Sequence, residues 1–109
     1  MRQFARLGRS SEIAFVRRRG LKLVFPTFAV FSAEGRAGPS RIAITVSKTV
    51  GGAVERNLVR RRIRGALEEL GGAVPTGRRF LIVARPGALF QPYAGLAADV
   101  RRAVGKAGD

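Results

Sequence analysis

The segment "VERNLVRRRIRGALEEL", residues 54–70, constrains the fold of this chain more than any other stretch. Its first eleven positions hold five arginines and one asparagine, and the rest is mostly apolar or acidic. At about 100° per residue, one side of a helix would carry an apolar stripe made of Val59, Ile63, Ala66, Leu67 and Leu70. Such a stripe is wide enough to pack on a sheet, so we expect an amphipathic helix with one side in a core.

The neighbouring side of this helix is strongly basic. We call it the arginine face and define it as Arg56, Asn57, Arg60, Arg61 and Arg64. Like charges this close destabilise a helix, so we expect a negatively charged partner there. Guanidinium groups are planar and can hold two phosphate oxygens or stack on a base. Arg62 lies apart from this face, and we expect it to pair with Glu55 or to lie in solvent.

The charge of the whole chain points to the same kind of partner. Among 109 residues, Lys and Arg number 21 and Asp and Glu number 7, which gives a formal net charge of +14. Self-repulsion of this size opposes compaction, and a polyanionic partner such as nucleic acid explains it. A hydrophobic fraction of 46% is enough for a core, so we expect residues 1–109 to form a single domain.

The missing residue types exclude several classes of site. The chain has no Cys and no His, so it lacks the usual zinc ligands and an imidazole base. Glu68 and Glu69 are the only adjacent acids, and neighbours on a helix do not face each other. We therefore predict no catalytic residue and no metal site in the protein. The longest apolar stretch, "LVFPTFAVF", is too short to span a bilayer, and we expect a cytoplasmic protein without membrane contact.

Periodicity and turn residues predict an α+β fold. We expect helices over 10–19, 54–70 and 93–107, the first ending at Gly20 and the second at Gly71. Between the first two, 21–33 is rich in β-formers and interrupted at Pro26, and 41–47 alternates like a half-buried strand. The run at 78–85 is apolar almost throughout, as in a strand buried on both faces. The predicted order is αβββαβα, with about four strands in the sheet.

One motif resembles a known family. "TVSKTVGGAVERNLVRRRIR", residues 45–64, is similar to the signature of the protein subunit of bacterial ribonuclease P. Arg60 replaces a lysine of that pattern, and the matching residues are Val46, Ser47, Lys48, Gly51, Ala53, Val54, Arg56, Asn57, Arg61 and Arg64. The similarity extends to "RLGRSSEIAFVRRRG" and "FLIVARPGA", and so covers nearly the whole chain. Thr49 and Leu58 depart from the pattern, because the family has a lysine and an arginine there.

The resemblance implies both a fold and a role. The fold is an α-β sandwich in which the arginine helix crosses over between parallel strands with a left-handed sense, against the general rule. The role is to bind the catalytic RNA of ribonuclease P and to help it remove the 5′ leader from precursor tRNA. The resemblance further implies that Mg²⁺ held chiefly by the RNA performs the hydrolysis, and we expect the protein alone to be inactive. The implied RNA-binding residues are Lys48, Arg56, Asn57, Arg60, Arg61 and Arg64.

The resemblance also implies a cleft for the leader between the first helix and the sheet. Its residues here are Ile13, Arg17 and Phe31, although the family commonly has aromatics at the first two positions. Ile13 and Arg17 are four residues apart and share a helix face. Phe31 offers a ring for stacking, and we expect Arg17 to stack on a base or pair with a phosphate. Alternatively, Ile13 and Phe31 are core residues and Arg17 lies in solvent.

Three other classes of protein would share some of these features. A ribosomal protein, or another protein that binds structured RNA, would have the same size and charge, although ribosomal proteins often carry long basic tails. A nuclease acting alone would need a carboxylate cluster for metal ions. A DNA-binding helix-turn-helix protein needs two helices joined by a short turn, whereas strand-like segments flank the arginine helix. We therefore expect RNA partners and no DNA.

Overall fold

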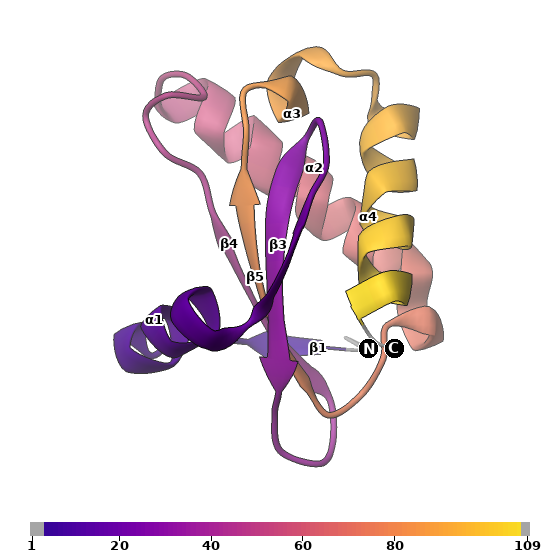
Figure 1. The fold of residues 1–109 in the computed structure, drawn as a ribbon. Helices are drawn as coiled ribbons and strands as arrows, with labels where there is room; N and C mark the ends of the chain where they lie inside the picture. The colour runs from indigo at the N-terminus through magenta and orange to yellow at the C-terminus, as the bar shows by residue number, and fades with distance from the viewer. Residues whose placement is uncertain (1–3, 108–109) are drawn as a thin grey trace.

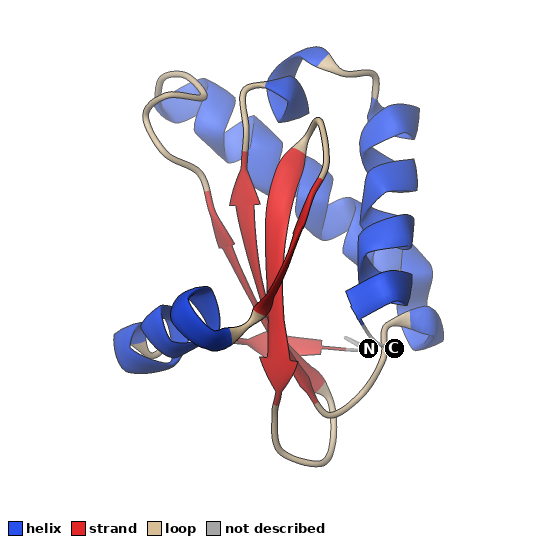
Figure 2. Cartoon of the chain, in the orientation of Figure 1, coloured by secondary structure: helices blue, strands red, loops and turns tan. Residues whose placement is uncertain are grey.

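A computed structural model describes residues 4–107, which form one sheet with helices on both faces (Figures 1 and 2). The outermost residues of the predicted domain, 1–3 and 108–109, lie outside the described part. The elements in chain order are β1 (Phe4–Arg6), α1 (Ser10–Arg19), β2 (Leu21–Val24), β3 (Phe28–Glu34), β4 (Ser40–Thr45), α2 (Ala53–Leu70), a 3-10 turn (Gly71–Ala73), β5 (Arg78–Ala84), α3 (Gly87–Phe90) and α4 (Tyr93–Ala107).

The sheet is mixed, with the strand order β1-β4-β5-β3-β2. β2 with β3 and β3 with β5 are antiparallel pairs, whereas β1 with β4 and β4 with β5 are parallel. β5 therefore lies at the centre, as its apolar sequence predicts. Phe80, Leu81 and Ile82 are all buried, and because successive side chains of a strand point to opposite faces, both faces of β5 are covered.

The connection from β4 to β5 has the unusual handedness that the family resemblance implies. These strands are parallel neighbours, and α2 lies between them in the chain. In Figure 1 both strands point upward, β5 lies to the right of β4, and α2 passes behind them. A helix behind the sheet with a step to the right makes a left-handed crossover, an exception to the right-handed rule.

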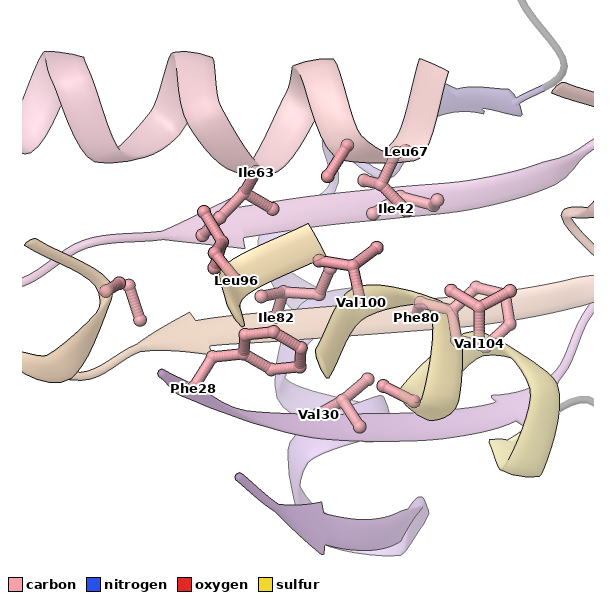
Figure 3. Packing of buried hydrophobic residues seen from close by; sticks show 14 of the residues in the cluster. Phe28, Val30, Ile42, Ile63, Leu67, Phe80, Ile82, Leu96, Val100 and Val104 are labelled. Carbon is pink, nitrogen blue, oxygen red and sulfur yellow. The ribbon is translucent and has the colours of Figure 1, made fainter. Parts of the chain in front are cut away.

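The larger core lies between the sheet and the helices α2 and α4 (Figure 3). The predicted apolar stripe is confirmed, because Val59, Ile63, Ala66 and Leu67 are buried and Leu70 is partly buried. The side chains that meet in this core include Phe28, Val30, Ile42, Phe80 and Ile82 from the strands and Ile63, Leu67, Leu96, Val100 and Val104 from the helices.

Among the described helices, α1 is the one that covers the opposite face of the sheet. Its smaller buried cluster consists of Leu7, Val16, Ala43 and Leu81. Ile13, Phe31, Ala33 and Val83 pack against that cluster and stay partly exposed. α1 is too short to cover the whole face, so apolar side chains there remain within reach of solvent.

Pro26 separates β2 from β3, as the sequence predicts. The two strands form a hairpin in which Phe25 N–H donates to Phe28 O at 2.8 Å. The hydroxyl of Thr27 donates to Oδ2 of the buried Asp99 on α4 at 2.8 Å. Arg102 donates to the other oxygen of Asp99 at 2.6 Å, so the hairpin turn is fixed to α4.

Two short elements add to the predicted order. β1 pairs over three residues with the start of β4, from Phe4 opposite Ser40 to Arg6 opposite Ile42, so the sheet has five strands where we expected about four. α3 is a single turn that begins at Gly87, after Pro86. Within residues 4–107, no helix combines the length and the apolar character that crossing a membrane requires.

Candidate nucleic-acid interface

The arginine face begins where α2 begins, and the preceding loop fixes that start. Glu55 Oε1 accepts a hydrogen bond from Gly52 N–H at 3.0 Å, and so satisfies a free donor at the helix N-terminus. Gly51 packs against the same side chain, because a Cβ at Gly51 would lie 2.8 Å from Glu55 Cβ. Glu55 therefore caps the N-terminus of α2.

The side chains of the arginine face are positioned in part by each other. Arg60 donates from its Nη1 to Asn57 Oδ1 at 2.9 Å, and Arg56 Nε lies 3.4 Å from Gly52 O. Arg61 and Arg64 are exposed and make no hydrogen bond or ion pair within residues 4–107, so their donors remain available. Lys48 is exposed in the turn after β4, in the loop that leads into α2.

Part of the arginine face opens into a groove of about 380 Å³ that we call the β4 groove. Arg60 and Arg64 line it from α2, Arg6 lines it from β1, and Ile13 lines it from α1. Its floor is β4, from Ile42 to Thr45. β1 ends at Arg6, opposite Ile42, so within the described residues no strand covers the rest of this edge. The groove therefore places two residues of the arginine face, Arg60 and Arg64, beside one residue of the predicted cleft, Ile13.

The three predicted cleft residues lie together where α1 packs on the sheet, with Ile13 and Arg17 on α1 and Phe31 on β3. Ile13 and Phe31 pack against the same buried cluster. The guanidinium carbon of Arg17 lies 6.0 Å from the centroid of the Phe31 ring, within range of a cation-π interaction. Ile13 and Phe31 thus contribute to the core, as one alternative expected, while Arg17 lies over a ring.

Two residues of this surface were not predicted from the sequence. Lys22 stands opposite Phe31 in the β2–β3 pair, with its Nζ 5.5 Å from the ring centroid. Its place follows from the hairpin register, which the position of Pro26 alone does not determine. Arg6 reaches the β4 groove because β1 pairs with β4, and a three-residue strand has no periodic signal to reveal it.

Arg62 corrects one expectation. Its Nη1 donates to Ala88 O at 3.3 Å and to Gln91 O at 3.1 Å, both at α3. It therefore neither pairs with Glu55 nor lies free in solvent. Glu55 is engaged at the helix N-terminus, and the carbonyl groups at the end of α3 are free to accept. Arg62 joins α2 to α3, apart from the arginine face.

The interface can bind anions and stack on flat groups. Guanidinium groups from two elements converge on the β4 groove, and the partly exposed Phe31 ring lies beside two cations. Within residues 4–107, no three His, Cys, Asp or Glu side chains are close enough together to hold a metal ion. The fold and this surface together define an α+β protein with a concave, basic surface.

Comparison with known proteins identifies the family. The family model of ribonuclease P matches residues 1–108. The ribonuclease P protein component of Gluconacetobacter diazotrophicus is 39% identical over 106 residues, covering 94% of this chain and 90% of the relative. That of Acidothermus cellulolyticus is 36% identical over 104 residues, covering 93% and 86%. The chain therefore belongs to the family of ribonuclease P protein components.

The fold agrees with this assignment. The ribonuclease P protein from Thermotoga maritima superposes with a TM-score of 0.82, covering 96% of this chain and 97% of that chain, at 20% identity. Similarity at this level concerns the fold alone, and it includes the mixed sheet and its helices.

Proposed function

We propose that this chain is the protein subunit of ribonuclease P and binds the catalytic RNA of that enzyme through Lys48 and the arginine face. The β4 groove is the observation that carries the proposal, because it brings Arg60 and Arg64 beside Ile13 of the cleft. A groove lined by guanidinium groups and apolar side chains suits a single strand of RNA, which needs both charge and contact surface.

The leader of precursor tRNA is the proposed ligand of the cleft formed by Ile13, Arg17 and Phe31. The Phe31 ring is half-buried against the sheet, so its orientation is fixed. Arg17 and Lys22 lie over that ring and add positive charge beside it. A leader base would stack at Phe31 while these cations approach the neighbouring phosphates.

The chemical step belongs to the RNA in this proposal. Mg²⁺ held chiefly by the catalytic RNA supplies the hydrolysis of the phosphodiester bond. The protein neutralises phosphate charge and holds the leader, and the assembled enzyme acts in the cytoplasm. These roles need no protein nucleophile, only cations and a stacking surface that stay in place.

Reconstitution tests the proposal directly. The purified protein, the catalytic RNA of a bacterial ribonuclease P and Mg²⁺ are incubated with precursor tRNA, singly and together, and the 5′ ends of the products are mapped. We expect no cleavage by the protein alone, and faster leader removal by the RNA when the protein is added. Leader removal by protein freed of contaminating nuclease would refute the proposal, as would an RNA reaction that the protein leaves unchanged.

The RNA that the tagged protein retains in cells provides a second test. We expect one structured RNA that cleaves precursor tRNA when isolated. Recovery of ribosomal RNA in its place would favour a ribosomal protein.

A further inference from the structure

A second basic pocket lies at the end of the sheet opposite the start of α2, next to the β4 groove. Figure 1 shows the loop between β3 and β4 at the bottom of the sheet and the start of α2 at the top. A pocket of about 540 Å³ lies beside that loop, and we call it the loop pocket. Its arginines are Arg36 of the loop, Arg41 of β4, and Arg78 and Arg79 of β5. None of them belongs to the arginine face or to the cleft.

Positive charge dominates the loop pocket. Its lining holds four arginines and two acids, Glu12 and Glu34. Glu12 Oε2 lies 3.9 Å from Arg41 Nη1, too far for a hydrogen bond. Arg36 and Arg41 are exposed, and neither guanidinium group makes a hydrogen bond within the part of the chain that the structure describes, although that of Arg41 forms a long ion pair with Glu12. Their guanidinium donors are therefore available to a ligand.

Arg79 is already held in place. Its Nε donates to Glu34 O at 2.8 Å, and its guanidinium carbon lies 4.8 Å from the centroid of the Phe15 ring. Gly35 leaves room for this arrangement, because a Cβ there would lie 3.1 Å from Arg79 Cγ. The terminal nitrogens of Arg79 make no hydrogen bond within residues 4–107. An arginine that is fixed before binding loses less side-chain entropy when it binds.

The wall of the pocket also holds unsatisfied polar atoms. Glu12 Oε2 and Arg78 Nε are the buried side-chain atoms of the described residues that lack a hydrogen-bond partner, and both residues line this pocket. Native proteins satisfy most buried polar groups. Elsewhere on the same side chain, Nη2 of Arg78 donates to Ser32 Oγ at 3.3 Å. Of the two atoms, Arg78 Nε is a donor that can serve an anion, whereas the Glu12 carboxylate is the counter-ion of Arg41.

We propose that the loop pocket binds a backbone phosphate of the RNA partner, as a second contact made by residues outside the arginine face. Arg41 and Arg79 would hold the phosphate oxygens, since planar guanidinium groups match them in pairs. Arg36 on the loop closes the site from outside. The identity of the polyanion as RNA rests on the function proposed above. The geometry of the pocket, which suits an anion, is independent of that proposal.

The double variant Arg41→Ala/Arg79→Ala tests this site in the full-length protein. Its control is Arg101→Ala/Lys106→Ala, which removes the same charge from exposed positions of α4. Affinity for the in vitro transcribed catalytic RNA of a bacterial ribonuclease P is measured across a salt series, and thermal melting confirms that each variant folds. We expect the pocket variant to lose roughly tenfold more affinity than the control. Its slope of log affinity against log salt should fall by about 0.7 to 0.9, the value for one lost phosphate contact.

A lysine variant separates a shaped site from general charge. Arg41→Lys/Arg79→Lys should keep the salt slope but bind several-fold more weakly, because lysine lacks the planar fork. Wild-type affinity in the lysine variant would overturn the proposed site, as would equal losses in the pocket and control variants. If the wild-type protein binds this RNA and only substitutions in the arginine face weaken binding, the loop pocket is refuted as a binding site while the proposed function stands.

Discussion

The two faces of the sheet are covered to very different extents. One face lies under α2 and α4, with 18 and 15 residues, whereas the other lies under α1, with 10. Ile63 and Leu67 are fully buried on the first face, while Phe31 and Ile13 remain partly exposed on the second. Burial of apolar area provides most of the stability of a small domain. The fully covered face therefore holds the fold, and the partly covered face keeps side chains available for a ligand.

A charge placed under α2 should produce the largest effect. Ile63→Asp would bury an unpaired carboxylate in the main core, at a cost of several kcal/mol, comparable to the whole stability of a domain. We expect an unfolded protein by circular dichroism. The control is Leu58→Asp on the same helix, where the side chain is 38% exposed, and that variant should fold. Cooperative melting of Ile63→Asp near the wild-type temperature would contradict the assignment of this face.

Loss of the arginine face should affect binding and leave the fold intact. In Arg60→Ala/Arg61→Ala/Arg64→Ala, none of the changed residues lies in the buried stripe. The slope of log RNA affinity against log salt should fall by about 2 to 3, since each lost phosphate contact contributes about 0.7 to 0.9. The control is Arg101→Ala/Lys106→Ala on α4. Because it removes two charges and not three, the change in slope is compared per charge removed. An unchanged slope, or a lowered melting temperature, would show that this face is not a separate binding surface.

The partly covered face should respond selectively to the leader. Arg17→Ala and Phe31→Ala, each assembled on the catalytic RNA, should weaken binding of precursor tRNA by about 1 to 3 kcal/mol, the range for one stacked base. Binding of mature tRNA should stay nearly constant, because it lacks the leader. Equal losses for both substrates would indicate that Arg17 and Phe31 do not contact the leader. Thermal melting of each variant is the control, because an unchanged melting temperature excludes unfolding as the cause of weaker binding.

The adjacent arginines Arg61 and Arg62 of α2 should contribute differently to the stability of the fold. Arg62→Ala removes two hydrogen bonds to α3, and we expect a loss of about 1 to 2 kcal/mol in the free energy of unfolding. Arg61→Ala removes an exposed side chain and should change that free energy by less than about 0.5 kcal/mol. Urea unfolding measures both. A larger stability loss for Arg61→Ala than for Arg62→Ala would reverse the roles of these two residues.

The features that the sequence predicted depend on local periodicity. The two sides of α2 follow from residues three and four apart, such as Val59 and Ile63, so one segment is enough to reveal them. The same holds for β5, whose uniform apolar run indicates burial on both faces. Pro26 divides the hairpin because proline cannot donate to a ladder.

The missed features depend on distant pairing. Arg62 contacts carbonyl groups 26 and 29 residues further along the chain, so its own helix gives no sign of them. β1 exists because Phe4, Ala5 and Arg6 pair with β4, and Arg6 joins the β4 groove for the same reason. The arginines of the loop pocket come from three segments, and only the sheet register brings them together.

The shortness of β1 has a consequence for how the free protein behaves at high concentration. Beyond Arg6, the β4 edge from Ala43 to Thr45 is open among the described strands, and an open edge is a template for pairing with another chain. Arg6, Arg60 and Arg64 surround this edge, so a second copy would bring like charges together. We expect Arg6→Ala/Arg60→Ala/Arg64→Ala to self-associate by light scattering at low salt, where the wild-type protein stays dispersed. The residues that attract RNA would thus also keep the edge from recruiting another copy of the chain.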